Sequence, residues 1–70
     1  MRISARNQLK GTVRSVTHGA VMSEVVVDVG GQEIVSAITK ASAEGLGLRE
    51  GSEVTVIIKA TEVMIATGNS

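Results

Sequence analysis

Valine and isoleucine alternate with other residues through two runs on either side of a glycine pair, and this pattern constrains the fold more than any other feature of the chain. In the run Val21–Val29, the odd-numbered valines from Val25 onward share one face, because successive side chains of a strand point to opposite faces. Gly30-Gly31 follows, and Glu33–Ile38 alternates again. Two glycines between two alternating runs predict a β-hairpin. Both faces of these strands are rather apolar, which indicates cover by the protein interior on one side and by another subunit on the other.

Three further alternating runs predict three more strands. The first, Gln8–Val16, precedes the hairpin and contains Gly11, which indicates a bulge or a bend of the kind that small barrels use to curl. The other two, Glu53–Lys59 and Glu62–Ala66, lie in the last third of the chain.

A short helix is predicted where the third strand ends. Thr39 is placed to cap it, Ser42 then falls at the third helical position, and Gly47 follows Leu46 as a left-handed stop. Three strands, a short helix and two strands is the order of the OB-type barrel. We therefore expect an all-β, OB-like five-stranded small barrel with one short helix between strands 3 and 4. The two hydroxyls beside the helix start also form a potential anion site, although capping alone accounts for the threonine.

The chain is 70 residues long, which predicts a single domain over residues 1–70, near the lower size limit for a stable core. It contains no cysteine and no Phe, Tyr or Trp, so its burial must come from aliphatic side chains within a hydrophobic content of 43%. Such a chain gains further burial by self-association, and we expect a homo-oligomer.

Seven basic and seven acidic residues give a formal net charge of zero. No global field therefore steers the protein towards nucleic acid or anionic lipid, and any selectivity for anions must be local. The sequence has no apolar run of signal-peptide or membrane-spanning length, which predicts a cytoplasmic protein without a membrane partner.

No combination of residues predicts catalysis. His18 is the only histidine and no cysteine accompanies it, so neither a zinc site nor a nucleophile with its base can be assembled. The Gly30-Gly31 pair lacks the lysine and the helix of a phosphate-binding loop. We expect a protein that is not an enzyme, with no catalytic residues, no direct metal ligands and no cofactor. The isolated glutamates are interpreted as exposed solubilising charges: Glu44, Glu50, Glu53 and Glu62.

What remains is a set of hydrogen-bond donors: Ser4, Arg6, Thr39, Ser42 and Lys59. A doubly charged tetrahedral oxyanion needs two positive charges, several hydroxyl or amide donors and few carboxylates nearby, and this set has that composition. The alternative for Arg6 and Lys59 is that each is a surface charge on an apolar stem.

Five segments resemble the molbindin, or Mop-type, molybdate-binding domain, and the similarity covers nearly the whole chain. The SARN opening and the IKAT segment are specific in combination. The segments are Ser4-Ala5-Arg6-Asn7-Gln8, Gly11-Thr12, Ala37-Ile38-Thr39 with Ser42 and Leu46-Gly47-Leu48, Glu50-Gly51, and Ile58-Lys59-Ala60-Thr61. The same domain resembles the oxyanion-binding modules of molybdate-responsive transcription regulators and molybdate-transporter ATPases.

The resemblance implies an OB-like subunit of a homohexamer, a trimer of dimers, that binds molybdate or tungstate at subunit interfaces. One class of site would combine residues of two subunits: Ser4, Ala5 and Arg6 from one, with Thr39, Ser42, Lys59 and Ala60 from its neighbour. A second class near the threefold axis would use the backbone of three turn residues, Gly19, Ala20 and Val21.

Three functions remain open. The first is an intracellular molybdate- or tungstate-binding protein for storage or homeostasis. The second is an OB-type module for single-stranded nucleic acid, which the absence of stacking aromatic residues and the zero net charge disfavour. The third is a structural assembly subunit in which bound oxyanions only neutralise interfacial cations.

Overall fold

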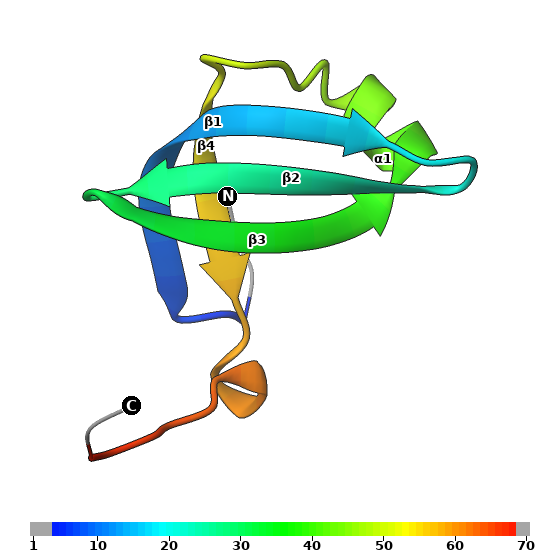
Figure 1. Cartoon of the computed structure of the whole chain (residues 1–70). Helices are drawn as coiled ribbons and strands as arrows, with labels where there is room; N and C mark the ends of the chain where they lie inside the picture. Colours follow the sequence, from blue (N-terminus) through cyan, green and yellow to red (C-terminus); the bar gives the residue numbers. More distant parts are fainter. Residues whose placement is uncertain (1–3, 69–70) are drawn as a thin grey trace.

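The long first strand, β1 (Asn7–His18), organises the sheet (Figure 1). In the computed structural model, which describes residues 4–68, the second half of β1 pairs with β2 (Met22–Val29) and its first half pairs with β4 (Glu53–Ile58). The remaining strand, β3 (Gln32–Thr39), pairs with β2. All three pairings are antiparallel, and the strand order is β3-β2-β1-β4. The ends of the expected domain, residues 1–3 and 69–70, lie outside the described residues.

One residue of β1 belongs to both halves of the sheet. Thr12 lies opposite Asp28 on β2 and opposite Glu53 on β4, so β1 changes partners at this point. The strand can coil here because Gly11 has no side chain: a Cβ on it would lie 2.7 Å from the Asp28 carbonyl oxygen. The predicted bend therefore lies at Gly11, while the irregularity in register comes later, between Val13 and Ser15.

The core lies inside the curve of the sheet and is small. Among the described residues, Val13, Val25, Val27 and Ala43 are the buried hydrophobic side chains. Partly buried aliphatic residues pack against the valine cluster: Val16, Val29, Ile38, Leu48, Val54 and Val56. The alternation predicted from the sequence is confirmed, because the valines predicted to share one face of β2 point into this core.

The helix α1 (Lys40–Gly45) follows β3 directly. Thr39 is its N-cap as predicted, and its side chain accepts the backbone N–H of Ser42. At the other end, Gly47 has a φ of 64°. The Gly47 N–H donates to the Glu44 carbonyl and the Leu48 N–H to the Ala43 carbonyl, at 3.0 and 3.1 Å. These two backbone hydrogen bonds, together with the left-handed Gly47, end the helix and turn the chain back towards the core.

The fifth strand predicted at Glu62–Ala66 is not formed within the described chain, and this part of the prediction is wrong. A 3₁₀ turn, η1 (Ala60–Glu62), follows β4 and leads the chain away from the sheet (Figure 1). Residues 63–68 pair with no strand of the described chain, and Met64 and Ile65 are 94% and 85% exposed. We call residues 63–68 the C-terminal arm. The all-β, OB-like architecture with a helix between β3 and β4 is otherwise confirmed, with four strands.

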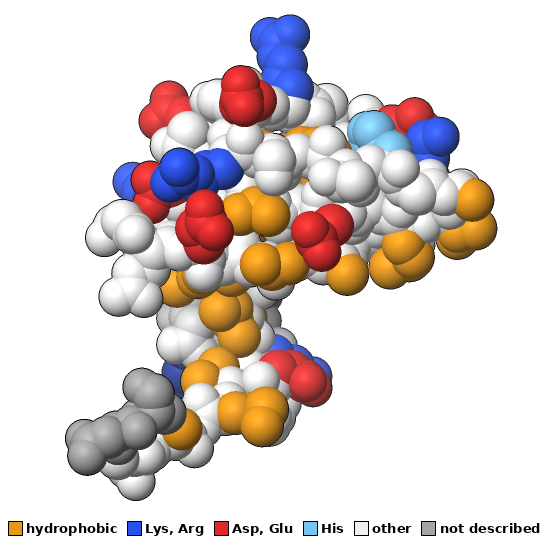
Figure 2. All heavy atoms as spheres, in the orientation of Figure 1, with side chains coloured by type: hydrophobic (Ala, Val, Ile, Leu, Met, Phe, Trp, Pro, Cys, Tyr) orange, Lys and Arg blue, Asp and Glu red, His pale blue; other side chains and the backbone are white. Residues whose placement is uncertain are grey.

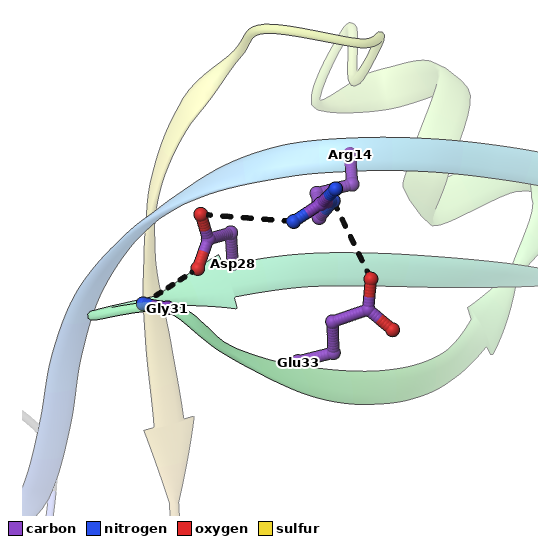
Figure 3. A network of polar contacts seen from close by, with 4 residues as sticks. All are labelled: Arg14, Asp28, Gly31 and Glu33. Atoms are coloured by element: carbon purple, nitrogen blue, oxygen red, sulfur yellow. Dashed lines mark hydrogen bonds and ion pairs between the residues drawn. The ribbon is translucent and has the colours of Figure 1, made fainter.

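Three charged residues form a network on the outer face of the hairpin (Figure 3). The β2–β3 register sets Asp28 opposite Glu33, an arrangement of like charges that disfavours pairing. Arg14 on β1 relieves it, with nitrogen–oxygen distances of 3.9 Å to Asp28 and 3.4 Å to Glu33. Asp28 also accepts the Gly31 N–H at 2.9 Å, which fixes the hairpin turn. Because these groups are exposed, the network stabilises the fold only slightly.

Candidate functional site

The outer end of the β1–β4 ladder carries the two cations that the sequence singles out. The last pair of this ladder sets Asn7 opposite Ile58. The same register, continued by one residue, sets Arg6 opposite Lys59, and both side chains are exposed. Figure 1 shows the start of β1 beside the end of β4. One chain therefore brings Arg6 and Lys59 to the same end of the sheet.

The ion pairs of the described chain involve neither of these cations, Arg6 and Lys59, whereas Arg14 lies between two carboxylates. Two like charges held at one end of a ladder repel each other unless an anion lies between them. The arrangement is suited to a divalent anion.

The neighbours of these cations lie beyond the ladder. Ala5 precedes Arg6, and Ala60, which follows Lys59, is the first residue of η1. Ser4 precedes them and is exposed. The resemblance implied that the Lys59 segment reaches the Arg6 segment from a neighbouring subunit. Within one chain the two segments flank the outer end of the β1–β4 ladder, and their division between subunits stays a prediction.

The two hydroxyl residues form a separate unit at the start of α1. The Thr39 hydroxyl oxygen accepts the Ser42 N–H at 3.1 Å, and the two hydroxyl oxygens are 2.7 Å apart, with Thr39 donating. The single hydroxyl proton of Thr39 is thereby committed to Ser42. The Ser42 hydroxyl keeps its own proton for an acceptor outside the chain.

The hydroxyl unit and the cation pair lie at opposite ends of the sheet. Thr39 pairs with Met22, beside the point where β2 pairs with the last residue of β1. Arg6 precedes the first residue of that same 12-residue strand. Figure 1 shows α1 and the end of β3 at the other side of the sheet from the start of β1. One chain alone therefore does not gather the predicted donors into a single pocket.

The turn residues of the second predicted site lie near the helix start. Lys40 donates its backbone N–H to the Val21 carbonyl at 2.7 Å. An open hollow of about 550 Å³ is bordered here by Ala20, Val21, Thr39, Lys40, Ala41 and Glu44. Gly19 does not line the hollow, and its N–H is taken by the Met22 carbonyl at 2.7 Å. The Glu44 carboxylate opposes an anion in this hollow, while Lys40 favours one.

His18 takes part in a structural contact. Its Nδ1 lies 2.6 Å from the hydroxyl oxygen of Ser23, a side chain that is only 2% exposed. This contact satisfies the buried hydroxyl. Within residues 4–68, no three His, Cys, Asp or Glu side chains come together in a way that could hold a metal ion. The same residues contain no helix with the length and apolar character needed to cross a bilayer.

Two amide side chains of the SARNQ segment have contacts that the sequence interpretation did not assign. Asn7 Nδ2 donates to the Ile58 carbonyl at 3.1 Å, and Gln8 Nε2 donates to the Ala5 carbonyl at 3.2 Å. Both bonds lie beside the cation pair. No local sequence pattern indicates the Asn7 contact, because it depends on the pairing of β1 with β4.

The TOBE domain family matches residues 3–65 of this chain. Molybdenum-pterin-binding protein 3 of Clostridium pasteurianum is 53% identical over 66 residues, which are 93% of this chain and 97% of that protein. The structure of a molybdate-binding protein from Sporomusa ovata has a TM-score of 0.92 at 43% identity, covering 96% of this chain and 100% of that chain. The cytoplasmic molybdate-binding protein ModG, with molybdate bound, has a TM-score of 0.82 at 44% identity, covering 86% of this chain and 43% of that chain.

These similarities agree with the resemblance found in the sequence. The family match extends across both the cation pair and the hydroxyl unit. With one relative 53% identical along nearly the whole of both chains, the chain belongs to the TOBE domain family, in its molbindin (Mop) group.

Proposed function

We propose that this protein binds molybdate or tungstate at interfaces between copies of itself, without catalysis. The observation that carries the proposal is the pair of cations, Arg6 and Lys59, placed by register at one end of a ladder without carboxylate partners. Two molybdate-binding proteins of known structure share this fold at more than 40% identity. In the proposed site, Ser4, Ala5 and Ala60 line the anion beside the cations.

The chemistry of the donor set favours an anion that carries no proton. Molybdate and tungstate are fully deprotonated at neutral pH, whereas phosphate retains a proton. In a pocket built from cations, hydroxyls and N–H groups, the cations and N–H groups cannot accept that proton, and a hydroxyl that accepts it no longer donates to the anion, so one donor or the phosphate O–H is left unsatisfied at a cost of roughly 1–3 kcal/mol. The site should therefore reject phosphate. The names of several relatives also mention pterin, but this chain has no aromatic residue on which a pterin ring could stack, and we propose the bare oxyanion as ligand.

A second copy is needed because the hydroxyl unit lies far from the cation pair in one chain. We propose that Thr39 and Ser42 of one subunit face Arg6 and Lys59 of another. The Ser42 hydroxyl, which Thr39 orients by donating to it, would donate to an ionised oxygen, and such a hydrogen bond is stronger than one between neutral groups. The weaker second site, at Gly19, Ala20 and Val21, stays a proposal that likewise requires neighbouring subunits.

The C-terminal arm supports self-association. The sheet ends with β3 on one side and β4 on the other, and an apolar groove of about 190 Å³ lies between these two edges. In an OB barrel, a fifth strand fills this position. Figure 2 shows hydrophobic side chains on the segment that extends away from the body of the sheet, and Val63, Met64 and Ile65 are exposed there. We propose that the arm of one copy fills the groove of another and contributes to the expected hexamer.

Storage or homeostasis in the cytoplasm is the role we propose for this binding. It is supported by ModG, which is described as a cytoplasmic molybdate-binding protein. Nothing in the structure or the similarities favours the nucleic-acid alternative. The structural-subunit alternative differs only in whether the anion exchanges, so dialysis of the loaded protein separates it from storage.

Isothermal titration calorimetry tests the proposal. The wild type should bind molybdate and tungstate and give no heat with phosphate. Arg6→Ala and Lys59→Ala should each weaken molybdate binding by about 100-fold, because each removes a charge-assisted hydrogen bond worth roughly 1.5–3 kcal/mol. Lys10→Ala, which removes an exposed cation elsewhere on β1, is the matched control and should bind as the wild type does. Unchanged affinity in both test variants would remove the proposed site.

A further inference from the structure

The β1–β4 ladder ends at a side-chain contact. Asn7 is opposite Ile58 in the register, and its side-chain amide also donates to the Ile58 carbonyl at 3.1 Å. Asn7 is partly buried, whereas the next residue outward, Arg6, is exposed. The amide therefore adds a link between the two strands at the last position before the cations.

This link between β1 and β4 matters because charge repulsion opposes their pairing one residue beyond Asn7 and Ile58. Continued register would set the guanidinium of Arg6 against the ammonium of Lys59, and like charges directly opposed disfavour an antiparallel pair. The ladder stops at this point, and β4 gives way to the η1 turn. In the ligand-free protein, the two cation-bearing segments thus repel each other where no backbone ladder joins them.

Gln8 acts on the same segment from the other side. Its side-chain amide donates to the Ala5 carbonyl at 3.2 Å, three residues back along the chain. This bond ties Ala5, the residue before Arg6, to the start of β1. It also engages the Ala5 carbonyl oxygen, whose partial negative charge is unfavourable beside a bound oxyanion.

We propose that Asn7 and Gln8 are positioning residues that hold the Arg6 and Lys59 segments together before the anion arrives. The choice of ligand rests on the proposed function, whereas the two amide hydrogen bonds, which we call the clamp, are contacts within the chain. Neither amide touches the oxyanion. Each acts through the segment that it fixes, so binding does not have to order those residues, and affinity is gained from preorganisation.

Three variants and one control test the clamp. Asn7→Ala removes the amide, Asn7→Asp keeps its shape but replaces the donor with a carboxylate, and Gln8→Ala removes the exposed partner amide. Gln32→Ala is the control, since Gln32 is an exposed amide on β3 without a side-chain hydrogen bond in the described chain. Nitrogen-15 relaxation reports the order of the Arg6 and Lys59 backbone amides, with Val25 in the core as an internal reference. Calorimetry with sodium molybdate reports affinity at a temperature where all variants are folded and assembled.

We expect lower order at Arg6 and Lys59 in ligand-free Asn7→Ala, lower order at Arg6 in ligand-free Gln8→Ala, and unchanged order at Val25. Saturating molybdate should restore the lost order. The dissociation constant should rise about tenfold with either alanine and further with Asn7→Asp, at an unchanged number of sites. A purely structural role would lower the melting temperature without changing local order or affinity in the folded protein.

Wild-type order and affinity in Gln8→Ala and in folded Asn7→Ala would overturn the proposal. If Asn7→Ala does not fold, Gln8→Ala decides alone, because its side chain is exposed. If the wild type does not bind molybdate, the proposed function fails, but the relaxation data on the ligand-free protein still decide whether the clamp exists.

Discussion

Gly11 on β1 lies so close to Val27 on β2 that a Cβ on the glycine would be 2.7 Å from Val27 Cγ1. The same hypothetical atom would lie 2.7 Å from the Asp28 carbonyl oxygen, a backbone atom that cannot move aside cheaply. This contact lets β1 coil so that its first half meets β4 and its second half meets β2. The position of the cation pair relative to the core depends on that coil.

Gly11→Ala should therefore destabilise the protein by about 1–3 kcal/mol, as overpacking against a fixed backbone does. Urea unfolding followed by circular dichroism measures the change. Gly45→Ala is the matched control, because a Cβ there meets no atom within 4 Å and the residue ends a helix without a positive φ. That variant should be neutral or up to about 1 kcal/mol more stable. Equal stability of the two variants would contradict the close approach.

Thr39 should contribute to stability through its cap as well as to binding. Thr39→Val removes the acceptor of the Ser42 N–H and should lower the free energy of unfolding of the ligand-free protein by about 1 kcal/mol. Thr39→Ser retains the acceptor and should remain within a few tenths of a kcal/mol. Thr17→Val, at an exposed position of β1, is the control for loss of a surface hydroxyl. If Thr39→Val matches that control, the cap does not stabilise the helix.

The C-terminal arm should control assembly. Ile65→Asp places a charge on a side chain that we propose is buried in the groove of another copy, so it should shift sedimentation velocity profiles towards the monomer. Burying one such aliphatic side chain is worth about 1.5–3 kcal/mol, all of which the aspartate forfeits. Thr67→Asp, also in the arm but polar, should leave assembly unchanged. A fully assembled Ile65→Asp variant would show that the arm lies outside the interface.

The alternation of aliphatic residues was sufficient to predict the four strands that share a core. On β2, for example, Val25 and Val27 recur with the period of a pleated sheet and are buried as expected. The helix could also be predicted from local sequence, because Thr39 caps its start and the left-handed Gly47 follows its end. For these elements, the properties of residues close together in the sequence were sufficient for the prediction.

The predicted fifth strand was wrong for a reason that the sequence does not contain. Val63 and Ile65 have the alternation of a strand, but strand formation needs a neighbouring edge, and the η1 turn carries the segment away from the edges of its own chain. The donor set was incomplete for a related reason. The roles of Asn7 and Gln8 depend on which strand end meets which, and tertiary register decides that.

Mixing two inactive variants tests most directly the claim that each site combines the cations of one copy with the hydroxyls of another. One variant carries Arg6→Ala and Lys59→Ala, and the other carries Thr39→Ala and Ser42→Ala. Each alone should bind no molybdate. After unfolding and refolding together in equal amounts, calorimetry should find about one quarter of the wild-type number of sites at wild-type affinity, because each half-site is drawn at random. Refolding either variant alone is the control, and a mixture that binds no more than its separate components would contradict the shared site.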